Sequence, residues 1–192
     1  SNPSPNIEAG NGAESAQLSY FGRVNYAYDN KYLVNLSIRR DGISKFAPAN
    51  RWGTFGSVGL GWVASEEDFF NIDKIDFLKF KTSWGTLGNA IGFGENLFLP
   101  GLSISNVGVF GDNAYPSVTP AYFPAPDLKW EVIRGFDAGL ELKAFDYRLS
   151  ADIAFYDRTT KNIITDIRVV NLDGDFKTNL GTIKNTGLEV AL

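Results

Sequence analysis

Histidine and cysteine, two of the residues that most often carry out chemistry in proteins, are absent from this 192-residue chain. Their absence excludes Ser-His-Asp and Cys-His nucleophile systems, thiolate metal sites and most zinc centres, and it leaves no disulfide framework. The adjacent carboxylates Glu66 and Glu67 fall in a predicted turn, and their spacing does not suit acid–base work on a shared substrate. We therefore predict that the chain is not an enzyme, with no catalytic residue, no cofactor and no metal.

Three short motifs could bind ions, but each has a simpler interpretation. Asp173-Gly174-Asp175 looks like part of a calcium loop, yet it lacks the spaced acids and the closing glutamate of an EF-hand. The glycines between Gly53 and Gly61 could suggest a phosphate loop, but no Lys-Ser/Thr pair follows them and their context is a strand. Arg39-Arg40-Asp41-Gly42 could hold an anion. We favour charges that pair with neighbouring residues at a strand end, with Asp41-Gly42 starting a loop.

Aromatic side chains in one long segment are the best candidates for contact with a ligand. Residues 88–127 are rich in Gly, Asn and Pro, and connections longer than about 12–15 residues are usually functional or disordered. Aromatic faces beside polar amides suit stacking on sugars or holding peptides. The candidate ligand-contact residues are Phe93, Phe98, Phe110, Tyr115, Tyr122 and Phe123. The alternative is that these side chains pack the loop against itself or against a partner.

The elements that position these residues are predicted to be long strands. Apolar and polar residues alternate over 130–143 and again over 147–161, and only three or four residues join the two segments. Strict alternation is typical of a strand with one buried face. Strands in soluble proteins average about 5–6 residues, whereas a tilted strand that crosses a bilayer needs roughly 9–11. The pair therefore favours a transmembrane β-barrel.

The rest of the chain repeats this pattern. Residues 1–16 are predicted to be a loop or disordered lead-in, and Ser65 is predicted to cap one helical turn over 65–70. Further strands are predicted over 17–29, 32–40, 52–64 and 76–87, a cut strand over 187–192, and long connections over 88–127 and 162–185, the latter with a possible strand over 163–170.

The connections alternate in length along the chain. Those at 29–31, 65–75 and 144–146 would lie on one side of the membrane, and the three longer ones, at 41–51, 88–127 and 162–185, on the other. Short periplasmic turns and long extracellular loops are the rule for outer-membrane barrels.

Composition and charge agree with this fold class. The chain is 44% hydrophobic and 14% aromatic with 20 glycines, which favours β-structure. Its net charge is −4 and no basic stripe is present, which disfavours nucleic acid as a partner. No run of about 18 apolar residues predicts a transmembrane helix, and no signal peptide is present. We expect an internal fragment of a larger protein.

An ordered series of short motifs resembles the barrel of the SusC/RagA-type TonB-dependent transporters. The series covers roughly residues 17–192. It includes Ser19-Tyr20-Phe21-Gly22-Arg23-Val24-Asn25-Tyr26, Ser37-Ile38-Arg39-Arg40-Asp41-Gly42, Asn50-Arg51-Trp52-Gly53, Ser65-Glu66-Glu67-Asp68-Phe69-Phe70, Ser83-Trp84-Gly85, Tyr156-Asp157-Arg158-Thr159-Thr160-Lys161 and Asn185-Thr186-Gly187-Leu188-Glu189.

This resemblance implies a fold, a location and partners. Members are 22-stranded barrels, integral to the outer membrane of Gram-negative cells, with an N-terminal plug and a SusD-like surface lipoprotein as a lid. They import oligosaccharides or peptides with energy passed through TonB. We therefore expect an all-β, antiparallel up-and-down sheet that forms about a third of a large barrel wall facing outer-membrane lipid, with the plug domain absent from this chain.

Two other functions remain open on sequence alone. One is a secreted β-sandwich that binds carbohydrate, which predicts short strands and a compact soluble monomer. The other is a small outer-membrane barrel that acts as a passive pore or adhesin. An enzyme is the weakest alternative.

Overall fold

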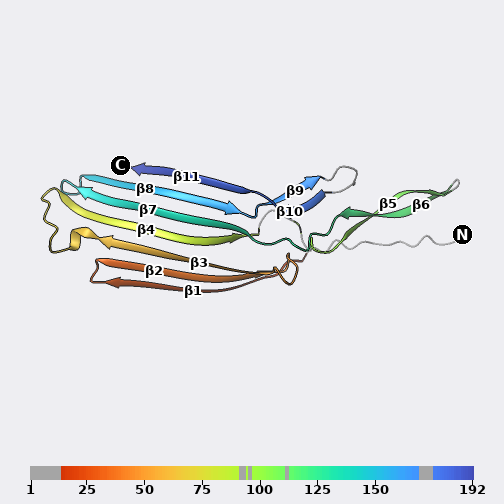
Figure 1. Ribbon diagram of the computed structural model, residues 1–192, viewed down its shortest axis with the longest axis horizontal. Coiled ribbons are helices and arrows are strands. Elements are labelled where there is room, and N and C mark those ends of the chain that lie inside the picture. Colours follow the sequence, from red (N-terminus) through yellow and green to blue (C-terminus); the bar gives the residue numbers. More distant parts are fainter. Residues whose placement is uncertain (1–13, 91–93, 95–96, 111–112, 169–174) are drawn as a thin grey trace.

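The computed structural model describes residues 14–90, 94, 97–110, 113–168 and 175–192, with only the backbone path for 101–122 and residue 175 (Figure 1). It consists of strands joined by turns, loops and one short 3₁₀ helix, η1 (Ala64–Glu66). The strands are β1 (Gln17–Tyr28), β2 (Tyr32–Ile43), β3 (Trp52–Val63), β4 (Ile75–Asn89), β5 (Gly101–Phe110), β6 (Asn113–Tyr122), β7 (Glu131–Ala144), β8 (Leu149–Lys161), β9 (Ile164–Arg168), β10 (Asp175–Asn179) and β11 (Thr182–Ala191). No helix among the described residues is long and apolar enough to cross a membrane.

Seven of the strands form one antiparallel sheet in the order β1-β2-β3-β4-β7-β8-β11. Six of them have at least 12 residues and the seventh, β11, has 10, which confirms the predicted long-stranded, up-and-down architecture. The sheet is a single curved layer, and β1 and β11 form its two edges (Figure 1). Among the described residues no second sheet covers either face, which argues against a β-sandwich.

The two predicted long connections contain structure that the sequence did not reveal clearly. Within 88–127, β4 continues to Asn89 and a separate hairpin of β5 and β6 extends away from the sheet (Figure 1). Within 162–185, β9 and β10 form a second hairpin, and β11 already begins at Thr182. The possible strand over 163–170 is confirmed as the shorter β9.

The connections sort to the two ends of the sheet as predicted (Figure 1). We call the end with the connections at 29–31, 64–74 and 145–148 the turn end, and the end with the connections at 44–51, 90–130 and 162–181 the loop end. At the turn end, Asp29 and Asn30 have φ values of 51° and 52°, a left-handed conformation that these two residue types tolerate well. Lys31 N–H donates to the Tyr28 carbonyl over 3.0 Å and closes this turn.

The predicted helical turn at 65–70 needs correction. The helix is η1, one residue earlier, and Val63 occupies its N-cap position without a side-chain hydrogen bond. Ser65 therefore lies inside the helix, and its buried hydroxyl has no hydrogen-bond partner among the described residues. The capping prediction was wrong because the strand β3 runs directly into the helix and leaves no separate capping residue.

A small hydrophobic core lies at the loop end, under the connections. Phe46 is fully buried there beside Trp130, with ring centroids 5.6 Å apart, and Phe55 meets Trp130 edge-on at the same distance. The Trp130 indole donates to the Arg51 carbonyl over 3.1 Å. The remaining members of the core are Ile43, Ala90, Leu97, Ala125 and Leu128. These contacts tie the bases of the three loop-end connections together.

Candidate functional site

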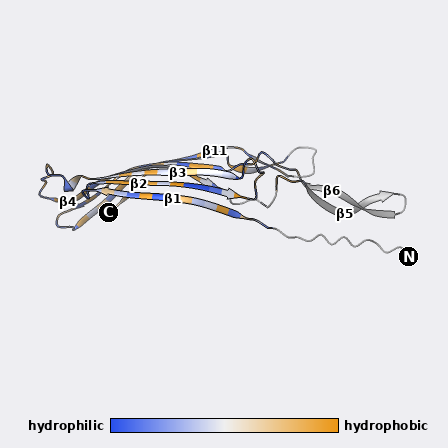
Figure 2. Cartoon of the chain, turned by 90° about the horizontal axis from the view of Figure 1, so that it is seen from below, coloured by the Kyte–Doolittle hydropathy of each residue, from blue (hydrophilic) through white to orange (hydrophobic). Residues whose placement is uncertain are grey.

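One face of the seven-stranded sheet carries apolar side chains from every strand, and we call it the apolar face. The hydrogen-bonded register places residues of neighbouring strands side by side in a row across it: Tyr28, Tyr32, Trp62, Phe80, Leu140, Ile153 and Val190. Figure 2 shows hydrophobic and hydrophilic residues alternating along the strands, as a two-faced sheet requires.

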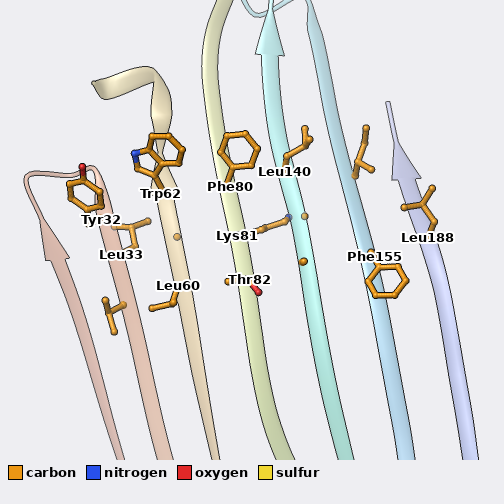
Figure 3. Close-up of a pocket in the computed structure, with 15 residues that line it drawn as sticks. Tyr32, Leu33, Leu60, Trp62, Phe80, Lys81, Thr82, Leu140, Phe155 and Leu188 are labelled. Atoms are coloured by element: carbon orange, nitrogen blue, oxygen red, sulfur yellow. The ribbon is translucent and has the colours of Figure 1, made fainter. Parts of the chain in front are cut away.

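Large hydrophobic side chains on the apolar face are left uncovered. Ile38 is 61% exposed, Trp84 52% and Leu188 66%. Figure 3 shows part of this face, where Leu60, Trp62, Phe80, Leu140, Phe155 and Leu188 project from successive strands and border a shallow open hollow. Soluble monomers rarely expose contiguous apolar patches larger than a few hundred Å². The apolar face therefore fits a surface that is surrounded by lipid.

Aromatic pairs mark both ends of the apolar face. Near the turn end, Trp62 stacks on Phe80 with ring centroids 5.6 Å apart, and Tyr28 stacks on Tyr32. Near the loop end, Tyr20 stacks on Trp52 over 6.2 Å. Rings with a polar tip at the two borders of an apolar band are typical of membrane interfaces.

The apolar band is slanted relative to the rows of paired residues. On β8 the first charged residue of this face is Asp157, which marks the border of the band there. Asp157 shares a row with Leu36 on β2, through Phe136, Trp84 and Val58. On β2, however, the first charged residue of this face is Arg40, four positions beyond Leu36. The border of the band thus shifts by four residues over four strand steps, from β2 to β8.

This slant has the size expected for strands that are tilted in a barrel. Neighbouring strands lie about 4.8 Å apart and residues about 3.4 Å apart along a strand, so the shift corresponds to a tilt of about 35°. Barrel strands in outer membranes are tilted by roughly 35–45°. On β1 the apolar face runs from Leu18 to Tyr28, which is about 34 Å along the strand and about 28 Å in height at this tilt. An apolar band with its aromatic girdles needs about that height.

The opposite face, which we call the polar face, carries charged and hydroxyl side chains in contact with one another. Lys81 on β4 binds Asp152 on β8 over 2.5 Å. Arg158 approaches Asp137 over 3.4 Å, and Ser37 and Ser57 share a hydrogen bond of 2.7 Å. These side chains are partly exposed rather than sealed in a core, so the polar face suits a water-filled lumen.

Near its loop end the polar face contains an ion pair with a buried carboxylate. Arg39 Nε donates to both carboxylate oxygens of Asp41, over 2.6 and 2.7 Å, and Asp41 is 5% exposed. The prediction that charges of the 39–42 motif pair within the wall is confirmed for Arg39. The prediction that Asp41-Gly42 starts the loop is wrong, because β2 continues to Ile43.

A carboxylate at the turn end fixes two of the border aromatics. Glu67 Oε1 accepts hydrogen bonds from the Tyr32 hydroxyl over 2.6 Å and from the Trp62 indole over 3.0 Å, and Lys31 lies 3.6 Å from Oε2. The Tyr32 hydrogen bond, followed by that of Trp62, lowers the pKa of the Glu67 carboxyl below its ordinary value of 4.5. Sequence reasoning missed this cluster because its partners lie up to 35 residues apart.

The predicted ligand-contact residues are distributed along one projecting segment. Phe98 and Phe123 lie half-buried near its base, whereas Phe110 and Tyr115 lie near the tip of the β5–β6 hairpin. Tyr122 pairs with Gly101 at the base of the hairpin, roughly 30 Å from the tip for strands of this length. Phe93 lies outside the described residues. The five described residues therefore share a segment but do not converge on one point.

In the described part of the chain, no group of three or more acidic residues could hold a metal ion. The Asp173-Gly174-Asp175 motif lies almost wholly outside the described residues, and the glycines from Gly53 to Gly61 lie within strand β3.

Comparisons with known proteins agree with this geometry. A family model described as "TonB dependent receptor-like, beta-barrel" matches residues 1–192. The TonB-dependent receptor SusC of Bacteroides thetaiotaomicron is 33% identical over 182 residues, which is 91% of this chain and 18% of SusC. The TonB-dependent receptor P39 of Formosa agariphila is 33% identical over 183 residues, 92% of this chain and 17% of P39.

A solved structure of the RagAB peptide importer in its "closed-closed" state has a TM-score of 0.82 and 32% identity. The similarity covers 93% of this chain and 19% of that one. The chain thus spans about a fifth of the length of the relatives that it matches. Its seven-stranded sheet is an open piece of a larger barrel wall, and the chain belongs to the TonB-dependent receptor-like β-barrel family.

Proposed function

We propose that this chain forms part of the barrel wall of a TonB-dependent transporter that imports oligosaccharides or peptides across the outer membrane. The observation that carries the proposal is that this chain, with its two-faced sheet, matches a RagAB peptide importer structure over 93% of the chain. In this proposal the apolar face meets lipid, and the polar face lines the path of the substrate. A closed barrel satisfies the backbone hydrogen bonds that a bilayer cannot.

The work of this wall is passage rather than bond chemistry. Its polar face offers partly exposed pairs such as Lys81 with Asp152, which water screens, so that they would hold passing solute only weakly. The relatives with known names are receptors and an importer, and none is named as an enzyme. We propose that this chain likewise has no catalytic role.

The partners and substrate class rest on the relatives. SusC is named as a TonB-dependent receptor, and RagAB is named as a peptide importer. By analogy we propose that the complete protein works with a SusD-like surface lipoprotein over its loop end, and that TonB supplies its energy. The identities to SusC and to RagAB, 33% and 32%, favour neither oligosaccharide nor peptide.

An uptake experiment in cells tests this function. Cells that carry the complete gene, and matched cells that lack it, would be given fluorescently labelled oligosaccharide and oligopeptide mixtures. We expect one mixture to accumulate only in cells with the gene, and accumulation to stop when TonB is removed. Equal uptake of both mixtures with and without the gene would contradict the proposal, and uptake that persists without TonB would support a passive pore.

We also propose that aromatic residues of the 88–127 segment contact the substrate. The hairpin that carries Phe110 and Tyr115 extends beyond the loop end, where an arriving substrate would meet it (Figure 1). Replacing both residues with Ser in the complete protein should weaken substrate binding at least tenfold by calorimetry. Replacing Ser103 and Ser117 of the same hairpin with Ala should leave binding unchanged. Equal affinity of the two double variants would refute this contact.

A further inference from the structure

Two arginines on the apolar face stand at the border of the apolar band without an acidic partner. Arg40 on β2 and Arg134 on β7 are both exposed. Neither forms an ion pair with another residue in the part of the chain that the structure describes. Their directly opposed cross-strand neighbours are uncharged: Tyr20 and Thr54 for Arg40, and Thr86 and Thr159 for Arg134.

Two arginines of the polar face provide a comparison. On the polar face, Arg39 and Arg158 each have a carboxylate, provided by Asp41 and Asp137. The one described carboxylate near Arg134 on the apolar face is Asp157, and Lys184 already binds it over 2.8 Å. The border of the apolar face at the loop end is therefore cationic.

Arg40 is also held in place by aromatic rings. Its guanidinium lies 5.3 Å from the centroid of the Trp52 ring, and Trp52 in turn stacks on Tyr20. The Trp52 ring lies directly over Gly42, where a Cβ atom would come within 2.8 Å of it. A cation placed over an aromatic ring at a membrane border remains free to hydrogen-bond a phosphate with its outer edge.

The depth of the two arginines identifies what they meet. An arginine that faces hydrocarbon at the bilayer midplane is strongly destabilising, but near the interface it costs little. Arg40 lies just beyond Ile38 on β2. Arg134 lies just beyond Phe136 on β7, and the next residue of this face, Val132, packs against the loop-end core. At this depth the surface that continues from the acyl chains is the layer of lipid headgroups.

We propose that Arg40 and Arg134 form a binding site for the phosphate groups of anionic lipids in the leaflet that surrounds the loop end. The occupant is a lipid because the site is continuous with the apolar band, which receives the acyl chains while the arginines receive the phosphates. The site is separate from the substrate path on the polar face. It therefore goes beyond the proposed transport function and does not depend on the substrate.

The test compares two lipids that differ only in phosphate. The complete barrel protein, folded in neutral detergent, would be titrated with diphosphorylated lipid A and with its dephosphorylated form, and bound lipid would be counted by native mass spectrometry. One basic side chain at an anionic surface contributes about a fivefold change in affinity. We expect the unmodified protein to bind the phosphorylated form at least tenfold more tightly. Equal binding of the two forms would overturn the proposal.

Matched variants assign the effect to the two arginines. The double variant Arg40→Gln with Arg134→Gln should lose the preference for phosphate. Arg158→Gln, which removes one positive charge from the polar face, should keep it. A double variant that still discriminates, or an equal loss in Arg158→Gln, would refute the assignment.

A salt titration of the unmodified protein needs no variant to fold. The preference for phosphorylated lipid should shrink several-fold between 50 and 500 mM salt, because screening weakens exposed charge pairs. A preference that is independent of salt would overturn the electrostatic site.

Discussion

The sharpest prediction concerns a charge placed on the apolar face at mid-membrane depth. Ile153 on β8 lies between Leu149 and Phe155, near the centre of the band on that strand, and pairs with Leu140 and Val190. Changing Ile153→Arg would place a guanidinium in hydrocarbon. Ser150, three residues away on the same strand, lies on the polar face and is exposed, so Ser150→Arg is the matched control.

The expected magnitude follows from this position. An arginine on the lipid face of a barrel costs about 2–4 kcal/mol at the midplane. The lost burial of Ile153 against lipid acts in the same direction. A substitution to Arg at exposed Ser150 should change stability by at most about 0.5 kcal/mol, as surface substitutions usually do. The two variants should therefore differ by at least about 2 kcal/mol.

The assay is equilibrium unfolding of the complete protein from lipid vesicles by guanidinium chloride. Fluorescence of the lipid-facing residues Trp62 and Trp84 reports the transition. Equal destabilisation by Ile153→Arg and Ser150→Arg would refute the assignment of the apolar face to lipid, and so would a larger loss in Ser150→Arg.

Three further predictions concern local contacts at the two ends of the sheet. Glu67→Gln should lower the melting temperature at neutral pH, because a carboxyl whose pKa is lowered in the folded state stabilises the protein at pH values above its ordinary pKa. This stabilisation is lost as the pH falls through the lowered pKa. The difference from the unmodified protein should therefore vanish in melting curves recorded well below pH 4.5. A Cβ at Gly88 would lie 2.0 Å from the Phe55 ring, so Gly88→Ala should lower the free energy of unfolding by about 1–3 kcal/mol in denaturant titrations. The control is Gly135→Ala, where a Cβ would have no neighbour closer than 3.9 Å, and it should change the free energy of unfolding little. Phe46→Ala should loosen the loop-end core by about 3–5 kcal/mol and accelerate limited proteolysis of the loops, and unchanged cleavage rates would contradict the role of that core.

Alternation in the sequence was sufficient to predict the strands of the large sheet. In β8, odd-numbered residues from Leu149 to Phe155 are apolar and face one way, and a period of two leaves only one way to assign the faces. The turn at Asp29–Asn30 was also predictable, because these residue types favour a left-handed backbone.

The loop end was harder to predict because its contacts are not local. Phe46, Phe55 and Trp130 come from separate parts of the chain, and no periodicity links them. The β5–β6 hairpin was read as a connection, since its prolines and glycines mark turns more strongly than its alternation marks strands.

The cationic border could have been predicted in part. Arg40 and Arg134 occupy positions of the apolar face by simple alternation, but which charges lack partners depends on the register between strands. Asp157 is seen to be occupied only once β11 is placed beside β8.

The central claim, that this sheet is a membrane wall with one lipid face and one wet face, can be tested most directly by site-directed spin labelling. This chain has no native cysteine, so single cysteines can be placed at each position from Ser150 to Tyr156 of the complete protein in lipid vesicles, after any cysteine outside the chain is replaced by Ser. Oxygen, which is enriched in lipid, and a water-soluble nickel chelate would then be compared as relaxing agents. We predict a strict period of two, with Ala151, Ile153 and Phe155 reached by oxygen and the residues between them by the chelate. Uniform access by the chelate, or no alternation along the strand, would contradict the account.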